Sequence, residues 1–299
     1  MRSFCLIRSG GGRMWVGLCL VVLSSLLYGA EPSLRAYALR CGATPISIIL
    51  VNTLVFFLCC LFFCLISRAP IRMPVRRALQ PIAAGVANGL TGILLTTACR
   101  YIPVGCASVV HFTYPSIVCI AMALLFKYKI TWLKGFAILL SFIGLICISG
   151  NMTGGSFLGI PIALGSALTF AFYVIVLDRG DVSIALPVRM FYISLGACSV
   201  CLLLLLITMA FGAWTLRSLL AMVLCGGMTC GASFSFATGV KRIGASTASF
   251  CSLLEPISSL VFSALLYRET LSPVAFLGCA FSICAILCVS LSDHQTHKP

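Results

Sequence analysis

The stretch from Tyr114 to Ser149, YPSIVCIAMALLFKYKITWLKGFAILLSFIGLICIS, decides the fold because the chain repeats its pattern near the other end. Residues 255–290, EPISSLVFSALLYRETLSPVAFLGCAFSICAILCVS, align with it without a gap at a constant offset of 141 residues. In both copies a proline in second position is followed by an apolar run, a short polar connection and a second apolar run. A pattern that returns at a fixed offset predicts two copies of one structural unit.

The apolar runs are long enough to cross a lipid bilayer as helices. A spanning helix needs about 20 mostly apolar residues, because each residue advances the helix by about 1.5 Å. Charge clusters and Pro or Gly breaks divide the whole chain into ten such runs. They are 14–34, 45–67, 78–99, 103–126, 131–149, 157–177, 185–210, 216–238, 244–267 and 272–291. The predicted fold class is an all-α integral membrane protein with ten transmembrane helices.

The composition excludes a water-soluble protein. Hydrophobic residues make up 61% of the 299 residues and charged residues 9%, with a mean hydropathy of +1.15. A soluble domain carries about 25% charged residues, and this chain has too few to cover a wet surface. The net charge of +14 does not indicate a nucleic-acid partner, because the Lys and Arg residues are scattered between apolar runs without a basic face. The expected partner of the surface is lipid.

The repeat extends upstream of the quoted stretch and divides the chain into two halves. Gly85 aligns with Gly226 at the same offset of 141 residues. We predict a first five-helix repeat over 14–149, a second over 157–291, and a linker over 150–156. Because five is an odd number, the second repeat enters the membrane upside down relative to the first. Inverted repeats form a binding site near the midplane that opens alternately to either side.

The positive charges predict the orientation. With the N-terminus in the cytoplasm, 15 of the 20 Lys and Arg residues fall on the cytoplasmic side, where such residues are enriched. The 5 on the outer side are Arg35, Arg40, Arg100, Arg217 and Arg268. We expect both termini in the cytoplasm and the protein in the cell inner (cytoplasmic) membrane.

One motif carries a family resemblance. Leu254-Glu255-Pro256, followed by SALLYRETLS over 263–272, resembles the E-P … G-E-x-L-(S/T) signature of the EamA family of the drug/metabolite transporter superfamily. The chain departs from it at Arg268, where the family has Gly. The first half keeps the spacing of the motif but lacks both Glu residues. The resemblance implies a ten-helix permease that moves small metabolites, often outward.

Glu255 is the strongest candidate for a functional residue. It lies near the middle of its predicted span, where a carboxylate costs roughly 2.5–3.5 kcal/mol to insert and therefore faces a cavity or a partner. In one interpretation it binds a substrate amine or a proton. In the other it holds the fold at the Pro256 kink through hydrogen bonds to the backbone, Ser252 or Ser259. The sequence leaves both interpretations open.

His111 is the only His inside a predicted span, and its repeat equivalent is Ser252. Tyr114 follows His111, and Glu255 follows Ser252, at a spacing that places each pair on one helix face. If the two halves face each other, these four side chains line one polar pocket. An imidazole near a carboxylate can titrate near neutral pH and couple protons to transport. The alternative is a His that is only packed and hydrogen-bonded.

Weaker candidates for the cavity are Asn88 and Thr91 on the third span and Tyr173 on the sixth. Amide and hydroxyl groups inside membrane helices also serve as contacts between helices. Tyr173 aligns with Glu31, which lies near the outer end of the first span and is interpreted as interfacial. Cys198 and Cys201 form a C-x-x-C, but they lie in continuous apolar sequence without His partners, so neither a metal nor another cofactor is predicted.

These features predict a secondary transporter and not an enzyme. The chain has no G-x-x-x-x-G-K-[ST] loop for ATP, and its six acidic and three His residues form no catalytic cluster. We predict an exporter of small amino-acid-like or drug-like solutes that works by alternating access. The alternative is an importer or exchanger of an anionic metabolite, for which Arg100 or Lys241 would supply the charge. The sequence leaves a homodimer open.

Overall fold

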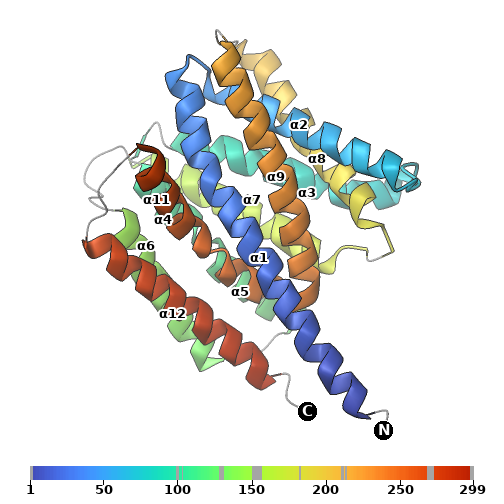
Figure 1. The fold of residues 1–299 in the computed structure, drawn as a ribbon, viewed down its shortest axis with the longest axis vertical. Helices are drawn as coiled ribbons and strands as arrows, with labels where there is room; N and C mark the ends of the chain where they lie inside the picture. The colour runs from blue at the N-terminus through green and yellow to red at the C-terminus, as the bar shows by residue number, and fades with distance from the viewer. Residues whose placement is uncertain are drawn as a thin grey trace.

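The computed structural model describes residues 3–98, 101–102, 104–127, 131–149, 157–181, 183–209, 212, 214–267 and 273–296. These residues form helices joined by short connections (Figure 1). In chain order they are α1 (Ser3–Arg40), α2 (Pro45–Ile66), α3 (Val75–Ala98), α4 (Val104–His111), α5 (Tyr114–Phe126), α6 (Trp132–Ser149), α7 (Gly159–Arg179), α8 (Leu186–Thr208), α9 (Leu216–Ile243), α10 (Ala245–Cys251), α11 (Leu254–Tyr267) and α12 (Pro273–Thr296). The predicted linker over 150–156 lies outside the described residues.

The described helices are those of a multi-pass membrane protein. Eight segments are long and apolar enough to cross a bilayer, and Trp132–Cys147 and Pro273–Val289 are shorter apolar helices. The composition therefore led to the correct class of fold. The predicted total of ten spans requires that these two shorter helices, which belong to α6 and α12, also cross the bilayer. That total stays a prediction.

Two predicted spans, the fourth and the ninth, are each divided into a pair of half-helices. Pro115 lies in the first turn of α5 and Pro256 in the first turn of α11. A proline has no N–H for the helix ladder, and its ring clashes with the carbonyl four residues earlier, here that of His111 or Ser252. The chain therefore leaves the helix for two residues at the same place in each of these two predicted spans.

Helix α1 is longer than the first predicted span. It continues past residue 34 to Arg40 and contains Pro32 without ending there. Glu31 and Arg35 therefore lie four residues apart on one face of the same helix. The sequence interpretation counted Arg35 as a charge in an outer connection, and the structure corrects it to a residue of α1.

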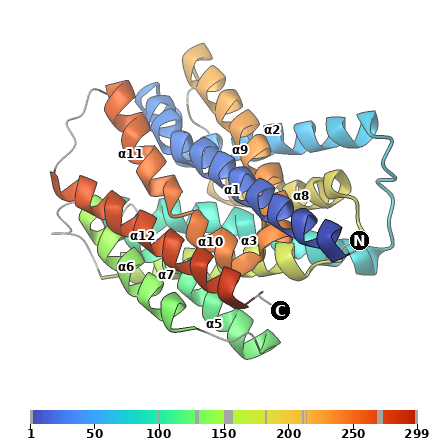
Figure 2. The same cartoon turned by 60° about the horizontal axis from the view of Figure 1, so that its bottom comes forward.

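The two halves pack against each other through pairs of helices, one helix of each pair from each half. Helix α1 packs against α9, and α7, the repeat equivalent of α1, packs against α3, the equivalent of α9. The equivalent helices α2 and α8 pack against each other, as do α6 and α12, which lie side by side in Figures 1 and 2. Gly144 of α6 is so close to α12 that a Cβ there would lie 2.8 Å from the carbonyl oxygen of Gly278. The core is thus made between the halves rather than within each one.

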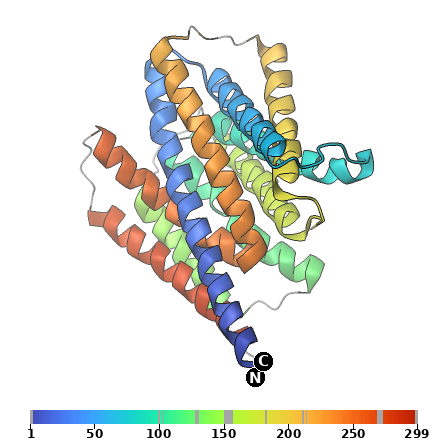
Figure 3. The same cartoon turned by 45° about the vertical axis from the view of Figure 1, so that its right-hand side comes forward.

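The equivalent helices α1 and α7 run in opposite directions. Near the start of α1, Gly17 packs against Ile243 at the end of α9, and α1 and α9 run side by side in Figures 1 and 3. Close to that same end of α9, Lys241 Nζ donates hydrogen bonds to the carbonyl oxygens of Asp178 (2.5 Å) and Gly180 (3.2 Å). The end of α7 and the start of α1 therefore lie at one end of the molecule.

Candidate binding cavity

A cavity of about 550 Å³ lies among helices of both halves. Its volume falls within the range of roughly 300–1,000 Å³ that is usual for small-molecule sites. Its wall combines charged or polar side chains with apolar ones. The former include Glu31, Arg35, Asn88, His111 and Glu255, and the latter include Leu95, Phe112, Leu145, Phe170 and Leu260. The cavity therefore has the composition of a site for a small solute with both polar and apolar parts.

Glu255 lines this cavity from the first turn of α11. The positive end of a helix dipole favours a carboxylate at that position. Its carboxylate forms no hydrogen bond or ion pair with any residue that the structure describes. The expected structural contact with Ser252 is not formed, because the Ser252 hydroxyl donates to the carbonyl oxygen of Ala248 (3.1 Å). Glu255 thus presents an unpaired acceptor to the cavity.

Glu31 and Arg35 add an ion pair that the sequence interpretation missed. Arg35 donates to one carboxylate oxygen of Glu31, and the Thr229 hydroxyl of α9 donates to the other. Glu31 is only 3% exposed and lines the cavity, so it is a buried residue of the cavity wall. The signal in the sequence was the pair of opposite charges four residues apart in an otherwise apolar run.

His111 lines the cavity from the end of α4. Its Nδ1 lies 3.0 Å from the Ser166 hydroxyl of α7. The imidazole centroid lies 5.5 Å from the rings of both Phe170 and Tyr114. The ring is therefore packed and hydrogen-bonded while one part of it faces the cavity.

Tyr114, Ser252 and Tyr173 lie behind the cavity wall. Their exposed fractions are 1%, 4% and 0%, and none of them lines the cavity. The Tyr114 ring packs edge-on against Phe170 at 4.6 Å. The predicted shared face fails because the i, i+3 rule requires a continuous helix. The break before α5 and the break before α11 turn Tyr114 and Ser252 away from the cavity that His111 and Glu255 line.

Asn88 and Thr91 of α3 both line the cavity, but they differ in their contacts. The Thr91 hydroxyl pairs with that of Thr169 on α7 at 2.8 Å, so it connects two helices. The Asn88 amide forms no hydrogen bond with the described residues, so its donors and acceptor are free for a solute. Of the two, Asn88 has the chemistry of a binding residue.

A glycine sets the distance between the helices that carry the charges. At Gly29 of α1, a Cβ would lie 2.4 Å from Cβ of Ser258 and 2.8 Å from the carbonyl oxygen of Glu255. Real Cβ atoms do not approach other atoms so closely, so only glycine permits this contact between α1 and α11. The contact brings the helix of Glu31 and Arg35 directly against the helix of Glu255.

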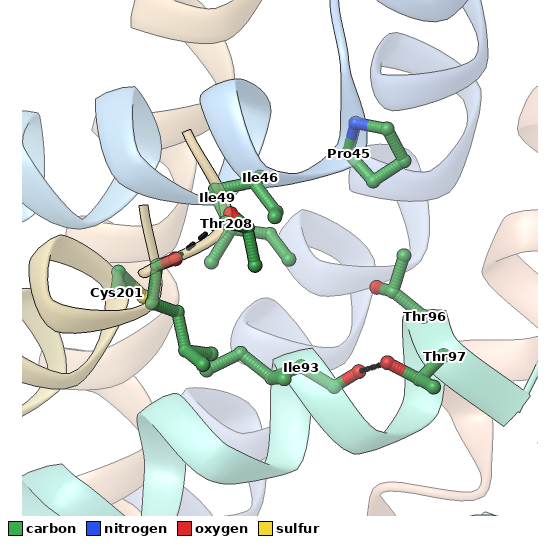
Figure 4. A pocket seen from close by; sticks show the side chains of 9 residues that line it. Pro45, Ile46, Ile49, Ile93, Thr96, Thr97, Cys201 and Thr208 are labelled. Atoms are coloured by element: carbon green, nitrogen blue, oxygen red, sulfur yellow. Dashed lines mark hydrogen bonds between the residues drawn. The ribbon is translucent and has the colours of Figure 1, made fainter. Parts of the chain in front are cut away.

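A second, smaller cavity of about 190 Å³ lies between α2, α3 and α8 (Figure 4). It meets the larger cavity at Ile49, which lines both. Two of its hydroxyl groups are already bonded to their own helices, Thr97 to the carbonyl of Ile93 (2.7 Å) and Thr208 to that of Leu204 (2.8 Å). With no charged side chain on its wall, it lacks groups that could orient a polar solute.

At the end of the molecule that contains Lys241, charged side chains connect α3 to the segment after α7. Arg77 at the start of α3 donates to Asp181 just after α7, with N···O distances of 2.8 and 3.0 Å. Ser183 donates to the same carboxylate from its hydroxyl (2.6 Å) and its backbone amide (2.9 Å). The Ser183 hydrogen bonds, followed by those of Arg77, lower the pKa of Asp181 from 3.8 to about 2. The cavity lies toward the opposite end, because its α1 residues are in the second half of that helix.

Comparison with known proteins agrees with the repeat and the fold. None of the curated proteins compared with the chain matches it. A solved structure described only as a protein crystal structure is similar over 94% of this chain and 99% of its own, with a TM-score of 0.79 and 16% identity, which shows a common fold. The model of the EamA-like transporter family matches twice, over residues 15–150 and 157–291. The chain therefore belongs to the EamA-like transporter family.

Proposed function

We propose that the protein is a secondary carrier that exports small amino-acid-like or drug-like solutes by alternating access. The observation that supports it most strongly is the unpaired carboxylate of Glu255 in a 550 Å³ cavity lined by both repeats. A buried carboxylate without a protein partner accepts either a proton or the ammonium group of a solute. If Glu255 binds either a proton or a solute but never both, proton movement in one direction is coupled to solute movement in the other.

The proposed topology is ten transmembrane helices in two inverted five-helix repeats, one over 14–149 and the other over 157–291. The opposite directions of α1 and α7 support the inversion. With both termini in the cytoplasm of a cell with an inner membrane, the cavity faces outward and the Arg77–Asp181 end is the closed cytoplasmic side. Transport then requires that this side open while the outer side closes.

The alternative of an anionic substrate receives limited support. Lys241 does not line the cavity, since its ammonium group binds the carbonyl oxygens at the end of α7. Arg100 lies outside the described residues. Arg35 does line the cavity, but it is paired with Glu31, and Glu255 adds a second carboxylate. Two acids and one base disfavour a solute that carries only negative charge.

The test is uptake into proteoliposomes under an imposed pH gradient, with a labelled panel of amino acids and organic amines. We expect pH-driven accumulation by the wild type and a loss of about 10-fold or more in Glu255→Gln, because the neutral amide can neither release a proton nor pair with ammonium. Asp293→Asn, at a position near the end of α12, is the control and keeps the wild-type rate. Wild-type transport by Glu255→Gln would remove Glu255 from the mechanism, and no accumulation of any solute by the wild type would refute the carrier.

A further inference from the structure

Arg35 has more hydrogen-bond donors than its protein partners use. A guanidinium group has five N–H donors in a planar fork. One nitrogen of Arg35 donates to Glu31, while its Nε is buried without a hydrogen-bond partner among the described residues. The side chain is nevertheless 36% exposed and lines the cavity. A solute in the cavity therefore reaches the exposed part of the guanidinium rather than its buried Nε.

Glu31 holds this guanidinium in place without covering it. The Glu31 side chain is 4% exposed, against 36% for Arg35, so the pair presents mainly its positive end to the cavity. The Thr229 hydroxyl of α9 donates to the second oxygen of Glu31, so this carboxylate is held by partners on two helices. Glu31 is therefore a positioning residue, and Arg35 is the group that meets the solute.

Glu255 supplies the opposite charge at the same cavity. The close approach at Gly29 brings α11 against α1, and Glu255 lines the same cavity as Glu31 and Arg35. A solute that is only cationic would satisfy Glu255 and leave the Arg35 donors unpaired. A solute that is only anionic would pair with Arg35 and be repelled by the carboxylate of Glu255. A solute with both charges satisfies each group, and buried polar groups are stable only when they are paired.

We infer that Arg35 binds the carboxylate of a zwitterionic solute whose ammonium group is bound by Glu255. The inference rests on the proposed carrier function and names the substrate class of the same cavity. A planar guanidinium binds a carboxylate through two parallel hydrogen bonds, which gives it geometric selectivity as well as affinity. The apolar wall, with Phe112, Phe170 and Leu260, accommodates an apolar side chain.

The experiment compares three probes that share one side chain and carry different charges: L-leucine, L-leucinamide and N-acetyl-L-leucine, with the corresponding L-phenylalanine series alongside. Binding to the purified full chain in nanodiscs is measured by calorimetry. We expect the wild type to bind at least one zwitterion about 10-fold or more tightly than its amide and its N-acetyl derivative, the scale of one charge-assisted hydrogen bond. Absence of that preference in both series would overturn the inference.

Variants at Arg35 test the assignment directly. Arg35→Gln leaves Glu31 buried and unpaired and is prone to misfold, so the double variant Glu31→Gln/Arg35→Gln removes both charges together. In the double variant we expect zwitterion affinity to fall to that of the amide, with the amide affinity changed by less than about 2-fold. Arg35→Lys keeps the charge but loses the fork and falls between the wild type and the double variant. Arg217→Gln, on the exposed start of α9, is the matched control.

The outcomes separate this inference from the carrier proposal. A folded double variant that still prefers the zwitterion shows that Arg35 does not bind the carboxylate, whatever the transport result. Counterflow of the same probes in wild-type proteoliposomes tests the carrier independently. Transport of the amide by the double variant, with loss of the zwitterion preference, supports both conclusions.

Discussion

At the scale of single residues, Gly29 determines how closely the two charged helices approach. We predict that Gly29→Ala lowers the melting temperature and weakens solute binding, because its Cβ would meet backbone and Cβ atoms of α11 that cannot move aside. Overpacking of this kind costs about 1–3 kcal/mol. The measurement is thermal unfolding of the purified protein in detergent, with and without solute.

The matched control is Gly227→Ala on α9, where a Cβ would meet no atom within 4 Å. Alanine is a better helix former than glycine by up to about 1 kcal/mol, so this variant should be neutral or slightly more stable. Equal melting temperatures for the two variants would show that the α1–α11 contact can relax.

The candidate residues also show what the sequence can predict at this scale. Glu255 and Asn88 were identified because polar side chains are expensive in lipid, and this argument needs no knowledge of the fold. Arg35 was missed because its role depends on where α1 ends and on Thr229, a residue far away in the sequence. A contact of that kind follows from tertiary packing and not from local pattern.

At the scale of elements, the helix breaks before α5 and α11 lie next to His111 and Glu255, the cavity residues of these two spans. The approximate positions of the helices followed from apolar runs, because lipid requires every backbone group to be bonded within its own helix, but the extension of α1 to Arg40 did not. The breaks were harder to predict, since Pro32 in α1 shows that a proline in a long apolar run need not end the helix. Only packing against the opposite repeat decides between a kink and a break.

The break at Pro256 leads to a prediction about Pro256→Ala. Alanine restores the missing N–H and removes the clash with the Ser252 carbonyl, so α10 and α11 should tend to join. We expect slower hydrogen exchange at residues 252–256 together with transport reduced by about 10-fold, because Glu255 would turn with the helix. Pro81→Ala, inside the continuous α3 and away from the cavity wall, is the comparison for transport. Unchanged transport with slowed exchange would show that the break does not position Glu255.

At the scale of the whole molecule, the charged groups form two sets with different tasks. One set lines the cavity and includes Glu255, an acid that has no partner among the residues described by the structure. The other, around Arg77 and Asp181, joins α3 to the α7–α8 connection at the opposite end. Under the proposed alternating access, the second set must break once in each cycle, so these contacts would have to be strong enough to close the end and weak enough to release it.

The two sets should therefore respond differently to pH. The lowered pKa of Asp181, about 2 in the folded protein, means that its contribution to stability is complete above its ordinary pKa of 3.8 and is lost only as the pH falls toward 2. Between about pH 5 and pH 8 the Arg77–Asp181 contact does not titrate.

We predict that Asp181→Asn speeds hydrogen exchange at residues 179–184, since the contact is lost, while the shape of the transport pH profile is retained. Glu255→Gln should flatten that profile and leave exchange at 179–184 unchanged. A shifted pH profile in Asp181→Asn would mean that the closed end, and not the cavity acid, senses protons, and the division of the charges into a solute site and a closing contact would then be wrong.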